Sequence, residues 1–327
     1  MNVAKAIRKL IDRGGRADEL SEQEAHEIFA AILDGGIADL ELGGIVVALH
    51  ANHITLPQLL GFHSALAERR FRLDPPSSAA RPVVLGSGPG TLDQPNLLPL
   101  LALMLQQLGV PVLVHGALHG DGRVASAHVF RELGVMPCVH LSQAQTQLVE
   151  HKLAFVPTAV LAPGLSWLLG LRNRLGLDSV AGTVAKLVDP FDGEALIVIP
   201  ASEEAERAVL REFLQVKPSN ALMLEATEGE AFADPRRRPN LEYFRDGERE
   251  VLFEAEGAPI KNLASRPLRI DAASTALWIR RAIGGEAALP LPLVNQIACC
   301  LYGSGYVRDM NQAKAIAAVE TGSLIAM

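Results

Sequence analysis

The N-terminal part of the chain carries its apolar side chains at the spacing of amphipathic helices. Ser21, with Glu24 three residues later, has the pattern of a capping box and predicts a helix that runs to about Leu33. A second helix is predicted from near Asp39, and a third after Thr55. The second helix is expected to carry on one face Leu40, Ile45, Val46 and Leu49. This pattern predicts a small helical domain.

Beyond a linker at 74–78, which reads Asp-Pro-Pro-Ser-Ser, short apolar runs alternate with helical segments. Buried strands are predicted at 82–85, 110–114, 153–156, 196–199 and 221–224. Such alternation is typical of a largely parallel sheet with helices on both faces. From residue 271 onward the pattern predicts three further helices. We therefore expect a helical domain over 1–74 and an α/β domain over 75–327.

The cysteines and the apolar runs bear on where the protein is found. Cys138, Cys299 and Cys300 form no CxxC pair and no disulfide framework. No apolar run approaches the roughly 18 residues that a membrane-spanning helix needs. The first residues lack the apolar stretch and small-residue cleavage site of a secretory signal. We expect a cytoplasmic protein that does not enter a membrane.

The net charge of −7 is concentrated in one segment. Residues 197–256 contain 14 acidic and 8 basic side chains, whereas the rest of the chain is nearly balanced, with 23 acidic and 22 basic side chains. A basic groove could therefore lie outside this segment. If it does, the acidic segment should face away from it.

A glycine-rich turn follows the first predicted strand, and it consists of Gly86, Ser87, Gly88, Pro89 and Gly90. Backbone N–H groups at such a turn, together with the N-terminus of the next helix, can bind a phosphate. This turn is neither a GxGxxG motif nor a P-loop, and Pro89 lacks an N–H donor. From the residues alone, a plain tight turn explains it equally well.

His115 and His119 have a spacing that metal ligands share on helices. The glycines at 116 and 120 argue against a helix here, and no third ligand lies nearby in the sequence. We expect no metal site.

Several segments resemble anthranilate phosphoribosyltransferases in the same order along the chain. They are 20–25, 39–44, 60–62, the turn at 86, His115-Gly116, Leu175-Gly176 and Asp189-Pro190. The resemblance covers almost the whole chain. It implies a small helical domain followed by a large α/β domain of the phosphoribosyltransferase/nucleoside phosphorylase type, with a mostly parallel central sheet.

The resemblance fails where that family binds the phosphates of its substrate. The family loop Gly-Thr-Gly-Gly-Asp-Gly corresponds here to 86–91, which lacks the acid. The motif that follows keeps Asn96, but Leu98 and Pro99 replace its hydroxyl residues and cannot donate a hydrogen bond to phosphate. The remnant of the phosphate site would comprise Gly86, Ser87, Gly88, Asn96, His115 and Gly116.

Other departures remove charge that the reaction needs. The family segment Lys-His-Gly-Asn-Arg corresponds to 114–118, which has lost Lys, Asn and Arg. Arg123 stands at a lysine position, while Asp121 adds a negative charge. The region 227–231 has acids but not the adjacent Asp-Glu pair that holds magnesium in the family. We therefore expect neither magnesium nor phosphoribosyl pyrophosphate to bind, and we assign no catalytic residue.

A further resemblance is to the YbiB branch of the same superfamily. It rests on Lys186 at a proline position, on Arg172 and Arg174 two residues apart, and on the segments 221–230 and 296–301. This branch implies a nucleic-acid-binding dimer on the transferase scaffold. The candidate contacts to phosphates are Lys186, Arg172, Arg174 and Arg123.

We therefore expect a catalytically degenerate relative of anthranilate phosphoribosyltransferase that binds nucleic acid, DNA foremost, without sequence preference through a basic groove. Whether the nucleic acid is single- or double-stranded stays open. The alternatives are an active glycosyltransferase with an altered substrate and a binding protein for a small metabolite. Judged from the residues alone, the arginines could equally be a solvated helix face, and Lys186 could lie over apolar neighbours.

A homodimer through the N-terminal helices is also expected. The side chains of Val46, Leu49, Ile54 and Leu60 offer more apolar surface than about 70 residues can bury alone.

Overall fold

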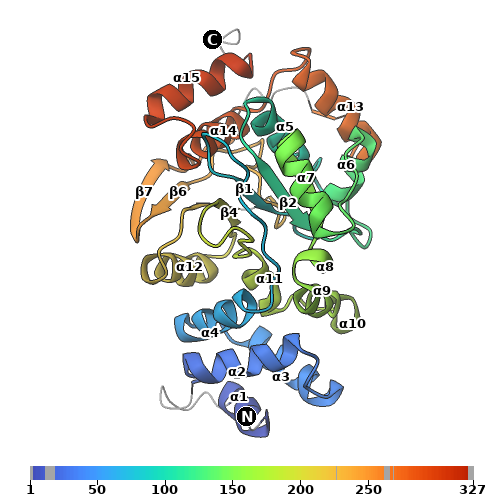
Figure 1. Cartoon of the computed structure of the whole chain (residues 1–327), viewed down its shortest axis with the longest axis vertical. Coiled ribbons are helices and arrows are strands. Elements are labelled where there is room, and N and C mark those ends of the chain that lie inside the picture. The colour runs from blue at the N-terminus through green and yellow to red at the C-terminus, as the bar shows by residue number, and fades with distance from the viewer. Residues whose placement is uncertain (1–2, 12–18, 226, 261–265, 268, 323–327) are drawn as a thin grey trace.

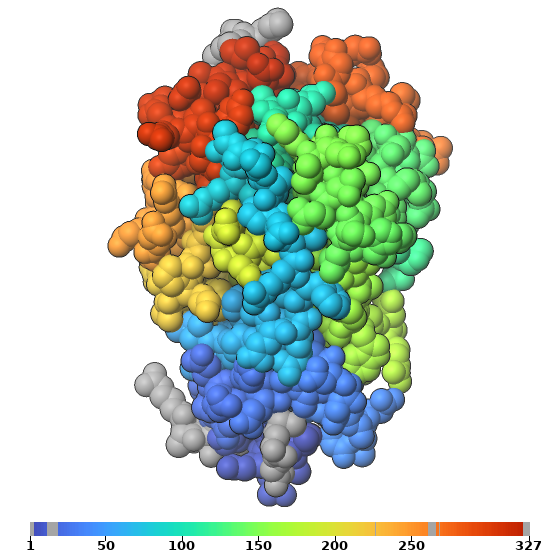
Figure 2. All heavy atoms as spheres, viewed as in Figure 1, coloured from blue at the N-terminus to red at the C-terminus, as the bar shows by residue number. Residues whose placement is uncertain are grey.

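The structure is a computed structural model that describes residues 3–11, 19–225, 227–260, 266–267 and 269–322. A helical part lies at one end of the molecule, and a larger α/β part extends from it (Figure 1). A segment without helix or strand, 68–82, joins them and runs along the face shown in Figure 2. Among the described residues, no helix is both long and apolar enough to cross a membrane.

The helical part has the predicted elements and one more helix before them. Its four helices are α1 (Val3–Ile11), α2 (Glu22–Leu33), α3 (Asp39–Ala51) and α4 (Leu56–Ala67). The capping box at Ser21 is confirmed, because its hydroxyl accepts from the N–H of Glu24 and the Glu24 carboxylate accepts in return. At the start of α4, the Gln58 side chain accepts a hydrogen bond from the N–H of Thr55 at 3.2 Å.

The α/β part is built on one sheet of seven strands. They are β1 (Val83–Gly86), β2 (Val112–Gly116), β3 (Leu153–Pro157), β4 (Leu196–Pro200), β5 (Ala221–Leu224), β6 (Leu241–Arg245) and β7 (Glu248–Phe253). Their order across the sheet is β3-β2-β1-β4-β5-β6-β7. The five predicted strands run parallel, and β6 and β7 complete the sheet in antiparallel fashion. The expected fold class is confirmed.

Helices cover both faces of this sheet (Figure 1). They are α5 (Leu98–Gln107), α6 (Ser126–Leu133), α7 (Leu141–His151), α8 (Thr158–Leu161), α9 (Pro163–Gly170), α10 (Arg172–Leu175), α11 (Val180–Ala185), α12 (Glu204–Val216), α13 (Ala272–Ile283), α14 (Leu291–Gly303) and α15 (Met310–Glu320). Successive strand residues alternate between two apolar clusters, so that Val84 joins one cluster while Val83 and Leu85 join the other. The sheet is therefore buried on both faces.

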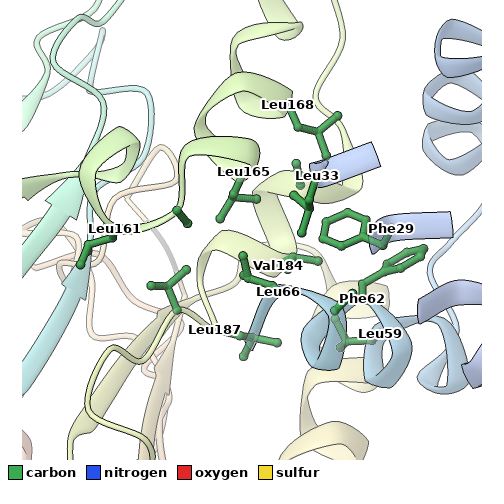
Figure 3. Packing of buried hydrophobic residues seen from close by; sticks show 14 of the residues in the cluster. Phe29, Leu33, Leu59, Phe62, Leu66, Leu161, Leu165, Leu168, Val184 and Leu187 are labelled. Carbon is green, nitrogen blue, oxygen red and sulfur yellow. The ribbon is translucent and has the colours of Figure 1, made fainter. Parts of the chain in front are cut away.

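The two parts of the chain share one of these clusters. Phe29 and Phe62, from α2 and α4, lie in the same cluster as Leu165 from α9 and Val184 from α11 (Figure 3). Gly164 is needed at this junction, because a Cβ there would lie 2.3 Å from the carbonyl oxygen of Leu33. The helical part is thus packed directly onto the α/β part.

The prediction that one face of α3 carries Leu40 together with Ile45, Val46 and Leu49 is wrong in part. Val46 and Leu49 are buried inside the subunit, at 2% and 6% exposure, and so cannot supply a dimer surface. Leu40, expected on the same face, is 84% exposed, and Val47 is also exposed. The cause is that α3 buries Ile45, Val46 and Leu49 toward the core, while Leu40 at its start points to solvent.

Candidate functional site

The candidate site lies where the loops after β1, β2 and β5 meet. In the sheet, β2 and β3 lie on one side of β1, and β4 and β5 lie on the other. The strand order therefore runs outward from β1 in both directions. In parallel sheets, ligands bind beyond the carboxyl ends of the strands at such a switch point. The glycine-rich turn, 86–90, leaves β1 at this point.

Close backbone contacts explain the glycines of this turn. A Cβ on Gly88 would lie 2.7 Å from the carbonyl oxygen of Gly229, and one on Gly90 would lie 2.7 Å from the backbone of Val124 and Ala125. Gly90 also has a φ of +97°, which favours glycine. Gly116, at the end of β2, similarly leaves room for Ser87, which lies 2.7 Å from its ideal Cβ position.

A buried glutamate from the loop after β5 fills the turn. The Glu230 carboxylate accepts a hydrogen bond from the N–H of Gly90 at 2.8 Å. The Ser87 and Ser126 hydroxyls lie 3.0 and 3.1 Å from its Oε2 atom. Glu230 is fully buried. The loop that would hold a phosphate in the family therefore surrounds a side chain of the protein itself.

Burial sets the protonation of this cluster. The pKa of Glu230 is raised to about 7, because desolvation outweighs the hydrogen bonds from Ser87, Gly90, Ser126 and Gly88 that favour the charged form. Desolvation also lowers the pKa of His115 to about 4, so its ring is neutral near pH 7. The His115 Nδ1 atom has no hydrogen-bond partner among the described residues.

A second carboxylate covers the next stretch of backbone. Glu228 accepts from the N–H of Leu92 at 2.7 Å and from that of Asp93 at 3.1 Å. The guanidinium of Arg123 lies 3.4 Å from the same carboxylate and 3.4 Å from the carbonyl oxygen of Gly90. Arg123 therefore neutralises a carboxylate within the subunit.

Both carboxylates belong to one tight turn. Thr227 and Glu230 pair with each other through backbone hydrogen bonds, and Glu228 and Gly229 between them have φ values of +54° and +89°. Two consecutive positive φ values are the mark of a type I′ turn. This turn directs both glutamates toward the glycine-rich loop.

The other remnants of the phosphate site have structural contacts. Asn96 is buried and donates to the carbonyl of Val124 at 3.0 Å and to the Ser126 hydroxyl at 3.1 Å. Its own carbonyl accepts from the N–H of Leu98, which lies with Pro99 in the core. In the described part of the chain, no three His, Cys, Asp or Glu side chains are placed to hold a metal ion.

The cations predicted to contact nucleic acid fall into two groups. Arg172 and Arg174 lie on α10, and Lys186 caps α11. Both helices pack against α9 near the helical part. Arg123 lies instead at the glycine-rich loop, where its contacts are with Gly90 and Glu228.

Each of the three cations near the helical part has an acidic partner. Arg172 pairs with Asp178 at 3.0 Å, Arg174 with Asp39 at 3.7 Å and Lys186 with Glu206 at 2.5 Å. Glu206 belongs to the acidic segment, so the expectation that this whole segment faces away from these cations is wrong. The acidic helix α12 packs beside α4, which brings Glu206 to Lys186.

Sequence reasoning missed Ser126, Glu228 and Glu230 as parts of the site. The available signal was Glu-Gly-Glu three residues after a buried strand, since a glycine in such a short polar segment is typical of a tight turn. Ser126, the first residue of α6, carries no motif of its own. Its role is visible only once the loops after β1 and β5 are brought together.

Comparisons with known proteins agree with this architecture. Residues 4–69 match the helical bundle domain of a glycosyl transferase family. YbiB of Escherichia coli (strain K12) is 36% identical over 307 residues, which cover 93% of this chain and 95% of that protein. The anthranilate phosphoribosyltransferase of Methanopyrus kandleri is 28% identical over 182 residues, 55% of this chain and 53% of the enzyme.

Solved structures show the same fold. The anthranilate phosphoribosyltransferase of Thermus thermophilus superposes with a TM-score of 0.78 at 22% identity and covers 98% of this chain and 94% of its own. The Saccharomyces cerevisiae enzyme in complex with PRPP and Mg gives 0.75 at 14% identity, with 98% and 93% coverage. With YbiB matched over nearly the whole length, the chain belongs to the YbiB-like branch of the anthranilate phosphoribosyltransferase (glycosyltransferase family 3) superfamily.

Proposed function

We propose that this chain is a non-catalytic member of its superfamily that binds the backbone of nucleic acid, DNA foremost, through basic side chains at the junction of its two parts. The proposal places the protein in the cytoplasm as a homodimer. The observation that carries the non-catalytic half is the buried Glu230 carboxylate inside the glycine-rich loop.

A phosphorylated substrate would find the donors of this loop already occupied. Gly90, Ser87 and Ser126 bind Glu230, and the backbone at Leu92 and Asp93 binds Glu228. A substrate phosphate placed there would also meet two carboxylates, which repel it. We propose accordingly that neither magnesium nor phosphoribosyl pyrophosphate is a ligand of the chain.

Calorimetric titration with phosphoribosyl pyrophosphate and magnesium tests this half of the proposal. We expect no saturable heat, because the loop donors are occupied and both carboxylates repel the ligand. A dissociation constant in the micromolar range would contradict the proposal and support the alternative, an active transferase with an altered substrate.

The nucleic-acid half is supported by the placement of α10. The side chain of Arg174 is 68% exposed, and the carboxylates paired with Arg172 and Arg174 are 73% and 81% exposed. Exposed ion pairs contribute only about 0–1 kcal/mol, so a phosphate can take the place of either carboxylate. Lys186 is held more firmly, because Glu206 is largely buried and also accepts from Thr183.

Charge reversal on α10 tests this half. We expect Arg172→Glu with Arg174→Glu to weaken binding of a labelled oligonucleotide to a similar degree for unrelated sequences, as measured by fluorescence anisotropy. The salt dependence of the affinity should flatten by about one unit of slope per lost contact.

Arg245→Glu is the matched control. Arg245 is likewise exposed and paired with an exposed acid, Asp246. It lies on β6, toward one edge of the sheet, whereas β3, the strand that precedes α10 in the chain, forms the other edge. We expect this variant to bind as the parent does. An α10 double variant that matches the control in affinity and salt slope would show that the two arginines are only a solvated helix face.

A further inference from the structure

We propose that the turn from Thr227 to Glu230 is an internal substitute for phosphate, which closes the glycine-rich loop to phosphorylated small molecules. The inference concerns this loop alone and stands whether or not the protein binds nucleic acid. It assigns to Glu228 and Glu230 the place that a bound phosphate would take, a place that Glu230 fills in both its charged and its neutral form.

The contacts of Glu230 are those that a phosphate oxygen would make. Backbone N–H groups of a turn after a strand, with hydroxyls beside them, form an anion-binding concavity. Here the Gly90 N–H and the hydroxyls of Ser87 and Ser126 converge on one carboxylate within 3.1 Å. Glu230, Gly90 and Ser126 are buried and Ser87 is partly exposed, so most of this contact is shielded from solvent.

Glu228 completes the substitution at the edge of the loop. Its carboxylate accepts two further backbone N–H groups, from Leu92 and Asp93, and faces the Arg123 guanidinium. Together the two glutamates accept hydrogen bonds from the N–H groups of Gly90, Leu92 and Asp93, and Glu228 also pairs with Arg123. Two adjacent carboxylates on these donors resemble the several charged oxygens of a phosphate.

The turn also fills the space that a ligand would need. The Gly88 backbone approaches Gly229 so closely that a Cβ on Gly88 would lie 2.7 Å from the Gly229 carbonyl oxygen. The ring of Pro89 lies 3.7 Å from the ideal Cβ position of Gly229. The loop and the turn are thus in direct contact.

The backbone of the turn is held in a conformation that a glutamate seldom adopts. Glu228 has a φ of +54°, in the left-handed region that is unfavourable for residues other than glycine. Such a conformation persists only where the surroundings fix it. The hydrogen bonds of the two carboxylates and of Thr227, whose hydroxyl donates to the Phe232 carbonyl at 2.7 Å, provide that restraint.

Inorganic pyrophosphate, titrated into the full chain by calorimetry at about pH 8 without divalent metal, tests this inference. The parent should give no saturable heat, because its donors are filled. The variant with both Glu228→Ala and Glu230→Ala should bind pyrophosphate with at least a tenfold gain over the parent, because its donors and Arg123 are then free.

Two controls distinguish removal of the side chains that fill the loop from a mere reduction in the negative charge of the protein. Glu204→Ala removes an exposed glutamate at the start of α12, where it pairs with Arg207 and Arg211. Like the parent, this variant should not bind pyrophosphate. Glu230→Gln keeps a side chain in the loop and should also stay inactive.

The inference is overturned if the folded double variant binds pyrophosphate no better than the parent, or if the parent binds it as well as the variant does. Should the double variant fail to fold, Glu228→Ala tests the outer part of the site, because it frees Arg123 and the N–H groups of Leu92 and Asp93 while Glu230 stays in place. It should bind pyrophosphate more tightly than the parent, and no gain in affinity would overturn the inference. Oligonucleotide binding by the parent is measured separately, so failure of the proposed function would leave this result intact.

Discussion

At the scale of single residues, Glu230 is the most informative side chain of the protein. Hydrogen-bond donors surround its carboxylate, yet burial raises its pKa to about 7. Near neutral pH, charged and neutral forms therefore coexist, and both fill the loop. The sequence shows an acid in this region but cannot show that it turns inward, because that depends on the meeting of two distant loops.

This raised pKa predicts how stability depends on pH. The folded protein holds the Glu230 proton more tightly than the unfolded chain does, so the contribution to the free energy of unfolding is complete below the ordinary pKa of 4.5 and is lost as the pH rises through about 7. Glu230→Gln cannot ionise. Its stability relative to the parent should increase between about pH 5 and pH 8, by up to about 3 kcal/mol.

Urea denaturation of the two proteins at both pH values measures this difference. Titration of other groups, such as His115, is common to the parent and the variant and cancels in the comparison. A stability difference that is the same at both pH values would show that the Glu230 carboxyl ionises normally.

At the scale of elements, the apolar pattern predicted most of the fold. The five parallel strands and the helices α2 to α4 were recognisable because each buries a continuous or periodic apolar set. The hairpin β6–β7 was missed, although Asp246 and Gly247 have the positive φ values of a type I′ turn. Its outer strand begins with three charged residues and is not buried at any position, so its apolar run is only three residues long.

The cations illustrate the limit of sequence reasoning about the site. Lys186, Arg172 and Arg174 were predicted as phosphate contacts from their positions in the sequence alone. The carboxylate partner of Lys186 comes from α12, and that of Arg174 from the start of α3. Only the packing of α10 and α11 beside α9 brings these charges together. A charge count along the chain cannot show such pairs.

At the scale of the whole molecule, the helical part still offers an apolar surface to a second copy, but only in part the one expected: Val46 and Leu49 are buried, whereas Ile54 and Leu60 are partly exposed. Leu40 and Val47 on α3 are exposed, as is Ile11 at the end of α1, which packs against α3. Exposed apolar side chains on neighbouring helices favour association. We therefore still predict a homodimer, and we now place its interface at Ile11, Leu40 and Val47.

Light scattering tests this surface. The parent should have twice the chain mass of 34.9 kDa, and Leu40→Glu combined with Val47→Glu should shift it toward the monomer, because the new charges would be buried at the interface. Trp167→Glu is the control, since Trp167 is also exposed but lies on α9. A parent that is monomeric throughout would contradict the prediction.

The central claim, that the chain binds nucleic acid through backbone phosphates, is tested most directly by the affinity of the parent for two oligonucleotides of unrelated sequence over a range of salt concentrations. We predict similar affinities for both, and a linear fall of the logarithm of the binding constant with the logarithm of the salt concentration. Undetectable binding at low salt, or an affinity that salt does not change, would contradict the claim.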